Sequence, residues 1–215
     1  MTKDTYCTLP FIHSHASVNG TFKPCCNAEG RDQPSTTNKY TLASWFQGTE
    51  MQQLRQDLLD GVRNPMCGRC WRDEDRAGSS IRFRMNEKYA HLANPDKPAI
   101  KYLDLKLSNE CNLQCRMCDQ TQSHLINKDI ELIKAGNDIV PTNWAGSTIP
   151  GYMNKIKPDQ YSALLKLIPH IKVLKVTGGE PTITKEFFKL IDYAVENDYA
   201  KNLNLSITTN GTRFT

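Results

Sequence analysis

The pattern of apolar and polar positions changes character near residue 100. In the segment IKYLDLKL (100–107), Leu103, Leu105 and Leu107 alternate with polar residues, which predicts a strand with one apolar face. Further strands are predicted at 171–177 and 203–209, and helices at 122–135, 158–168 and 185–197. Because strands and helices alternate, we expect an α/β fold with a parallel sheet and right-handed crossovers.

The first 99 residues follow a different pattern. Proline and glycine interrupt residues 1–40, where Asn19-Gly20 predicts a hairpin turn. A helix is predicted at 50–60, with Gly61 as its stop, from three apolar residues that share one face: Met51, Leu54 and Leu58.

The stretch 69–88 is crowded with charge, which favours a solvated face; a guide for an anionic or peptide substrate is the alternative. The sequence NPDKP (94–98) is typical of a linker. We therefore predict a small Cys-rich module at 1–93, a linker at 94–99 and an α/β domain at 100–215.

Length and charge limit the class of protein. The 215 residues carry 27 Lys and Arg against 23 Asp and Glu, and this mild excess does not require nucleic acid as a partner. No apolar run approaches the roughly 18 residues of a membrane span, and the N-terminal MTKDTYCTLP lacks the apolar core of a signal peptide. Eight cysteines without an export signal favour metal ligation over disulfides. We expect a cytoplasmic protein with no membrane partner.

Three cysteines follow the first predicted strand of the α/β domain, in the run LSNECNLQCRMCDQ. Cys111, Cys115 and Cys118 have the spacing C-x₃-C-x₂-C. Three thiolates can hold three irons of a cubane iron–sulfur cluster and leave the fourth iron open to a ligand, whereas structural clusters and zinc sites are closed by four protein ligands. The alternative is a zinc site that a distant histidine or carboxylate completes.

A second segment, TGGEP (177–181), follows the next predicted strand. Its two glycines allow a ligand to approach the backbone, and Glu180 offers a carboxylate to a cation. ITTNGT follows the third strand. All three segments lie at the carboxyl ends of predicted parallel strands, where ligands gather in such sheets and barrels.

The cysteine triplet and the GGEP segment together resemble the radical S-adenosylmethionine (SAM) superfamily. The resemblance implies a partial (β/α) barrel with about three of six strand–helix units, a 4Fe–4S cluster, and SAM chelated to its open iron. Reductive cleavage of SAM then yields a 5′-deoxyadenosyl radical that abstracts hydrogen from a substrate, with an electron donor such as a flavodoxin or ferredoxin.

The resemblance also assigns residues. The cluster ligands are Cys111, Cys115 and Cys118. Met117 stands near the adenine, where the family usually has an aromatic residue. The SAM contacts it implies are Gly178, Gly179 and Glu180 around the methionine amino group, Pro181 in the turn, and Thr209 and Asn210 near the cofactor.

The N-terminal cysteines resemble a SPASM or twitch auxiliary-cluster module, here placed before the barrel. The resemblance implies four ligands to a second 4Fe–4S cluster: Cys7, Cys25, Cys67 and Cys70. Cys26 could replace Cys25. A structural zinc site is the alternative, and His13 and His15 could join it, although each is better explained as a surface or satisfied core histidine.

The sequence therefore predicts a radical SAM enzyme, with a peptide or protein substrate favoured because SPASM and twitch proteins often modify such substrates. A small-molecule or nucleotide substrate, or a non-catalytic zinc- or cluster-stabilised binding module, are the alternatives. Since only three strands of the barrel are predicted, we expect a fragment whose isolated form is poorly soluble and nearly inactive.

Overall fold

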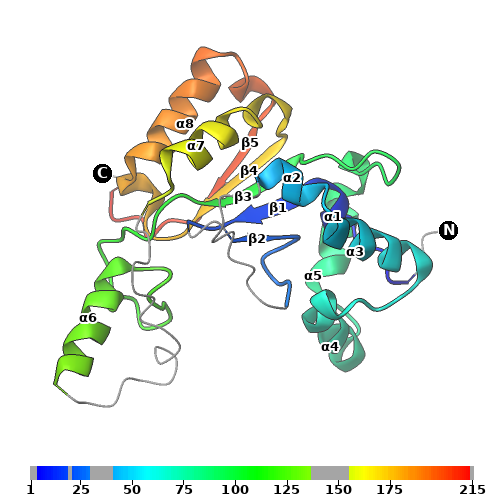
Figure 1. Ribbon diagram of the computed structural model, residues 1–215, viewed down its shortest axis with the longest axis horizontal. Coiled ribbons are helices and arrows are strands. Elements are labelled where there is room, and N and C mark those ends of the chain that lie inside the picture. The colour runs from blue at the N-terminus through cyan, green and yellow to red at the C-terminus, as the bar shows by residue number, and fades with distance from the viewer. Residues whose placement is uncertain (1–3, 19–20, 30–40, 137–154, 214–215) are drawn as a thin grey trace.

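The computed structural model describes residues 4–18, 21–29, 41–136 and 155–213. Its centre is a five-stranded sheet in the order β2-β1-β3-β4-β5 (Figure 1). Strands β1, β3, β4 and β5 run parallel, and β2 is antiparallel to β1. The strand bounds are His13–Ala16 (β1), Phe22–Lys23 (β2), Tyr102–Lys106 (β3), Val173–Thr177 (β4) and Asn204–Ile207 (β5). The α/β class and the three strands predicted after residue 100 are confirmed.

Helices connect and cover these strands. The α-helices are α1 (Leu9–Ile12), α2 (Leu42–Phe46), α3 (Thr49–Asp60), α4 (Gly68–Ala77), α5 (Ile81–Tyr89), α6 (His124–Ala135), α7 (Pro158–Leu165) and α8 (Lys185–Glu196). Short 3-10 helices are η1 (Pro65–Cys67), η2 (Ala90–Leu92), η3 (Ile168–His170), η4 (Pro181–Ile183) and η5 (Ala200–Asn202). The four helices predicted from apolar periodicity are confirmed within a few residues, and Gly61 ends α3 at φ +87°. No helix of the described segments is long and apolar enough to cross a membrane.

The first strand comes from a part of the chain that the sequence placed in a separate module. β1 pairs in parallel with β3, so one sheet contains strands from both sides of the linker predicted at 94–99. β1 and β2 form the hairpin expected here, although its turn at Asn19-Gly20 lies outside the described residues. The segment HSHA that forms β1 is buried along its whole length but has no alternation of apolar residues to predict a strand.

One face of the sheet is apolar and carries the core. Leu103 and Leu105 of β3 stand beside Leu174 and Val176 of β4, and all four are almost fully buried. They share a cluster with residues of α3, α7 and α8, and Figure 1 shows α7 and α8 together on one side of the sheet. Burial of each large aliphatic side chain stabilises the fold by about 1.5–3 kcal/mol, so this face holds the N-terminal segment and the α/β domain together.

The opposite face is polar toward the carboxyl ends of its strands. Near their amino ends Val173 packs in a small cluster with Phe11, Ile12 and Tyr89, and the rings of Tyr89 and Tyr102 lie 5.1 Å apart. Beyond this cluster, toward the loops that follow β3 and β4, the same face presents polar side chains. The sheet therefore separates a dry core from a polar surface.

The charged stretch 69–88 forms α4 and α5. Most of its arginines are exposed, as predicted for a solvated face. Arg82 differs, because its side chain is only 4% exposed and is ion-paired with Glu74 at 2.6 Å. Charge density alone does not distinguish this buried arginine from its solvated neighbours.

Candidate cluster and cofactor site

Three loops meet where β3, β4 and β5 end. The Glu180 N–H donates to the carbonyl of Glu110 at 2.6 Å, which ties the GGEP turn to the cysteine loop. The Asn210 N–H donates to Glu180 Oε2 at 2.7 Å, and Asn210 Nδ2 donates to Asn112 Oδ1 at 2.9 Å. The three segments predicted to gather at this edge of the sheet are thus linked by hydrogen bonds.

The cysteine loop is held by its own backbone and by the start of α6. The Cys118 N–H donates to the Cys115 carbonyl at 2.9 Å, forming a turn between these two ligand candidates. The Cys111 N–H donates to His124 Nδ1 at 3.3 Å, and Ser123 Oγ donates to the Leu113 carbonyl at 2.8 Å. The loop is therefore ordered by His124 and Ser123, two residues that the sequence motifs did not identify.

The three thiols of this loop face solvent to different degrees. Cys115 is exposed, and Cys111 and Cys118 are partly buried. Burial raises the pKa of Cys118, and the neighbouring Cys115 and Cys111 raise it further, so the three sulfurs are near enough to interact electrostatically. Within the described residues, no group of three or more His, Cys, Asp or Glu side chains is arranged so that it could hold a metal ion. The three thiols thus share one accessible loop, and their roles as cluster ligands remain predictions.

Glu180 lies at the centre of the loop contacts. It is 1% exposed, and its Oε1 accepts from the Thr182 N–H at 3.0 Å, the Thr182 hydroxyl at 2.7 Å and the Thr209 hydroxyl at 2.7 Å. Burial alone would raise the pKa of Glu180, but the bonds from Asn210, Thr182 and Thr209 outweigh it and lower the pKa.

This arrangement fits the predicted role of Glu180 toward an amino group. A carboxylate offers about four lone-pair sites. Among the described residues, Oε1 accepts three hydrogen bonds, whereas Oε2 accepts one, from the Asn210 N–H. Oε2 therefore keeps capacity for one more donor, such as the ammonium group of a methionine moiety.

The two glycines of the GGEP turn serve close contact between loops. Gly178 has φ +88°, and a Cβ there would lie 2.9 Å from Lys106 Cγ. A Cβ on Gly179 would lie 2.0 Å from the Glu110 carbonyl oxygen. The sequence predicts that these two glycines allow a ligand to approach the backbone. In the structure the close neighbour is the loop that leads to Cys111.

Gly179→Ala is therefore expected to lower the free energy of unfolding by about 3 kcal/mol, because the Glu110 backbone must move to admit a methyl group. Gly78→Ala is the matched control: Gly78 has φ +66° but nothing within 4 Å of a Cβ, so about 1 kcal/mol is expected. Urea denaturation measures both. Equal losses for the two variants would contradict the contact described between the GGEP turn and the cysteine loop.

The remaining predicted cofactor contacts lie around this centre. Pro181 is buried and begins η4. Asn210 is exposed, and its Nδ2 lies 3.8 Å from Cys111 Sγ. Met117 is 94% exposed and extends into solvent beside Cys118. The structure thus brings Glu180, Thr209 and Asn210 together, whereas the described residues leave Met117 almost fully exposed.

Four of the five N-terminal cysteines line one small pocket. Its walls include Cys7, Cys25, Cys67 and Cys70, together with Arg82. Burial is the main cause that raises the pKa of Cys25 and of Cys67 to about 12, and the neighbouring Cys70 contributes to the rise. Four thiols from three separate segments therefore line the same pocket.

Cys26 lies apart from this pocket. It is exposed, and its Sγ lies 4.0 Å from Asn27 Oδ1. Geometry therefore favours Cys25 of the two adjacent cysteines, although both assignments as ligands are predictions.

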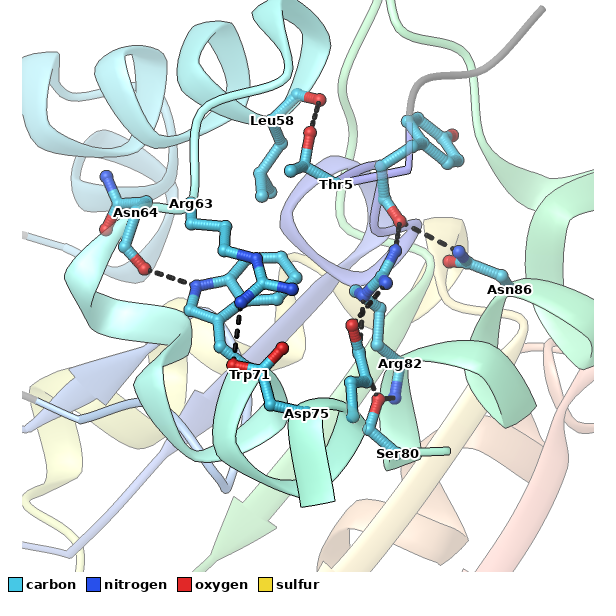
Figure 2. Close-up of polar contacts among 11 residues, drawn as sticks. Thr5, Leu58, Arg63, Asn64, Trp71, Asp75, Ser80, Arg82 and Asn86 are labelled. Atoms are coloured by element: carbon cyan, nitrogen blue, oxygen red, sulfur yellow. Dashed lines mark hydrogen bonds and ion pairs between the residues drawn. The ribbon is translucent and has the colours of Figure 1, made fainter. Parts of the chain in front are cut away.

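Arg82 joins the segments that carry these thiols (Figure 2). Its Nε and Nη2 donate to the two carboxylate oxygens of Glu74 at 2.9 and 2.6 Å, and its Nη1 donates to the Tyr6 carbonyl at 2.7 Å. Asn86 Nδ2 donates to the same carbonyl at 2.9 Å. Since Tyr6 precedes Cys7 and Glu74 follows Cys70 on α4, the arginine connects two sides of the pocket.

Trp71 follows Cys70 on α4 and is buried beside the thiol pocket. Its Nε1 donates to the Asn64 carbonyl at 2.9 Å, and the Arg82 guanidinium lies 5.0 Å from its ring centre. The buried indole excludes water from one side of α4.

The two N-terminal histidines belong to the sheet. His13 Nδ1 lies 2.9 Å from the Pro24 carbonyl, and burial lowers the pKa of His13 to about 4. His15 Nδ1 lies 3.5 Å from Asp104 Oδ1. Neither histidine lines the thiol pocket, in agreement with their interpretation as core residues.

The Asp104 side chain contacts one residue from each neighbouring strand, His15 of β1 and Lys175 of β4. Its Oδ2 accepts from Lys175 Nζ at 2.9 Å. Burial would raise its pKa, but the polar contact with His15 and the charge of Lys175 outweigh burial and bring the pKa to about 2. The pKa of Asp104 is lower in the folded state than in the unfolded state. The resulting stabilisation of the fold is therefore fully present at pH values above the ordinary pKa of aspartate, and it is lost as the pH falls through the folded-state pKa.

Asp104→Asn is accordingly expected to lower the free energy of unfolding at neutral pH by about 2 kcal/mol, since one pKa unit corresponds to about 1.4 kcal/mol. The difference from the wild type should shrink between about pH 4 and pH 2. Asp96→Asn, in an exposed loop, is the control. Chemical denaturation across this pH range tests the effect, and a difference independent of pH would contradict it.

Comparison with known proteins places these features in a family. Residues 105–215, slightly more than half of the chain, match the radical SAM superfamily, and the chain belongs to it. Enzymes of this superfamily use a 4Fe–4S cluster and SAM for radical chemistry. The match includes the cysteine loop and the GGEP turn and leaves all five N-terminal cysteines outside.

Among curated proteins, an uncharacterized protein of Methanocaldococcus jannaschii is 31% identical over 114 residues, which cover 53% of this chain and 31% of the relative. The chain thus spans about a third of the length of the curated relative it matches. No solved structure matches it significantly.

Proposed function

We propose that the protein cleaves SAM reductively at a 4Fe–4S cluster held by Cys111, Cys115 and Cys118, and that the chemistry abstracts hydrogen from a peptide or protein substrate. The observation that carries this proposal is the Asn210 side chain and backbone, which join Cys111 Sγ and Glu180 Oε2 in one site. When bound, the cluster supplies the electron that breaks a carbon–sulfur bond of SAM.

The chain's own groups bind and orient in this proposal. Glu180 accepts the methionine ammonium at Oε2 and remains ionised, because its four bonds from the chain lower its pKa. The glycines allow the GGEP turn to pack against the cysteine loop, so the Glu180 carboxylate is held at a fixed position relative to the three thiols of that loop. Preorganised acceptors of this kind cost no rearrangement when the cofactor binds. A flavodoxin or ferredoxin is the proposed electron donor.

The N-terminal pocket is proposed to hold an auxiliary 4Fe–4S cluster through Cys7, Cys25, Cys67 and Cys70. Support comes from the four thiols in one pocket, from three segments of the chain. Iron and zinc analysis of anaerobically reconstituted protein tests this assignment. Tetrahedral zinc at this pocket would replace the auxiliary cluster with a structural metal site.

Spectroscopy tests the main proposal. The reduced, anaerobically reconstituted chain should give a paramagnetic signal that changes when SAM is added, and 5′-deoxyadenosine should form. A signal unchanged by SAM, or zinc in place of iron at the cysteine triplet, would refute the proposal. A non-catalytic binding module would give neither the spectral change nor the product.

A further inference from the structure

A cavity of about 300 Å³ lies on the apolar face of the sheet, where α2 and α7 cover it. Ala16 of β1 and Leu105 of β3, which pair in register, line it from the sheet. Leu42 of α2 and Leu164 of α7 line it from the helices, and all four residues are buried. Protein interiors leave few voids larger than a water molecule, whose share of liquid volume is about 30 Å³. This cavity is therefore much larger than an ordinary packing gap.

Small side chains keep this space open. Three elements each contribute an alanine to the lining: Ala16 of β1, Ala43 of α2 and Ala163 of α7. An alanine side chain ends at its Cβ, so these elements surround the space without filling it. On α7 the lining residues Gln160, Ala163 and Leu164 have the spacing of one helix face. A larger side chain on that face would therefore enter the cavity.

Polar side chains stand at the mouth of the cavity. Asp159 and Lys166, near opposite ends of α7, are exposed, so water solvates both charges, and Gln160 is half-buried. Lys106 is the remaining charged residue of the described lining, and charges of both signs act on it. An apolar interior with a few polar groups at its edge is typical of small-molecule sites. The lining thus favours a ligand without a net charge.

The cavity lies beside the candidate cofactor site but is separate from it. Ile156 lines the cavity, and its N–H donates to the Leu107 carbonyl at 2.9 Å. Lys155, the preceding residue, is ion-paired at 3.1 Å with Glu110, which precedes Cys111. None of the described residues that line the cavity is a cysteine or belongs to the GGEP turn. A molecule bound here would contact the chain next to the cysteine loop without occupying the cofactor site.

We propose that this cavity binds a compact, neutral, mainly apolar small molecule. Pockets that hold small molecules begin at about 300 Å³, so the volume limits this ligand to on the order of ten non-hydrogen atoms. Phe22, a half-buried residue of the lining, offers an aromatic ring against which such a ligand packs. Binding at this site does not depend on the proposed radical chemistry.

Equilibrium dialysis tests the proposal with two neutral probes, indole and cyclohexanol, each in radiolabelled form. The anaerobically reconstituted chain should bind each probe at one site per chain, with a Kd on the order of 0.1–1 mM for indole. Indole-3-carboxylate adds a negative charge that the apolar cavity cannot solvate. It should therefore bind at least about tenfold more weakly than indole.

Two filling variants and one control assign this binding to the cavity. Ala163→Leu on α7 and Ala43→Leu on α2 place a larger side chain in the space, and each should weaken indole binding at least about tenfold. Ser162→Leu adds the same side chain at an exposed position that does not line the cavity, and should bind indole as the wild type does. Thermal unfolding checks that each variant folds. Because Ala43 is exposed, Ala43→Leu still tests the proposal if Ala163→Leu does not fold.

Four results would overturn the proposal. Neither probe may show saturable binding, or a filling variant that folds may bind indole as the wild type does. Equal or tighter binding of indole-3-carboxylate would indicate an anion site. Displacement of indole by SAM would place the probe in the cofactor site. SAM cleavage by the wild type and by Ser162→Leu tests the proposed function separately, since loss of either activity leaves the other measurable.

Discussion

Cys115→Ala is expected to reduce SAM cleavage to the uncatalysed background and to remove the spectral response to SAM. Cys115 is the middle cysteine of the triplet and its most exposed thiol. Two remaining thiolates cannot hold three irons of a cubane, so the site that binds SAM is lost. Iron content, electron paramagnetic resonance with and without SAM, and 5′-deoxyadenosine measure the effect.

Two comparisons make this result specific. The auxiliary cluster should remain visible in Cys115→Ala, because its four proposed ligands lie in a separate pocket. Cys26→Ala removes an exposed thiol outside that pocket and outside the triplet, and should keep both the iron and the response to SAM. Retention of the SAM response in Cys115→Ala would overturn the assignment of the open cluster.

Arg82→Met is expected to lower the free energy of unfolding by about 3–5 kcal/mol. The substitution leaves Glu74, whose side chain is 10% exposed, without its bidentate partner. It also removes the donor to the Tyr6 carbonyl next to Cys7. Chemical denaturation of the metal-free chain measures the loss without a contribution from a bound cluster.

The control variants separate charge from packing. Arg84→Met, on the same helix but exposed, should change stability by less than about 0.5 kcal/mol. Arg82→Met combined with Glu74→Leu should recover part of the loss, because no buried charge is left alone. If the double variant is less stable than Arg82→Met, the cost comes from packing around Trp71.

Apolar periodicity predicted the elements whose packing it controls. Strand β3 followed from the alternation of Leu103 and Leu105, and α8 from Phe187 and Ile191 at helical spacing. Strand β1 could not be predicted in this way. Its residues are buried by pairing with β3 and by polar contacts, such as that of His13 with Pro24, and such contacts over long sequence separation leave no local pattern.

The candidate site was likewise predicted only in part from the sequence. The motifs identified Glu180 and Asn210, and their position after parallel strands predicted that they meet. The motifs did not predict that Thr182, Thr209 and Asn210 would occupy most acceptor sites of Glu180, because the direction of a side chain depends on the folded loops.

The pairing of β1 with β3 limits how one molecule could contact both the cysteines of the N-terminal pocket and the cysteine triplet. Cys7 and Cys25 flank the β1–β2 hairpin at the end where β1 and β3 begin, whereas Cys111 follows the opposite end of β3. The five residues of β3 separate these margins by roughly 15 Å at about 3.3 Å per residue. A peptide bound at one end of β3 would reach the other end only as an extended segment of about five residues. The length of this strand would therefore determine which position of that peptide reacts.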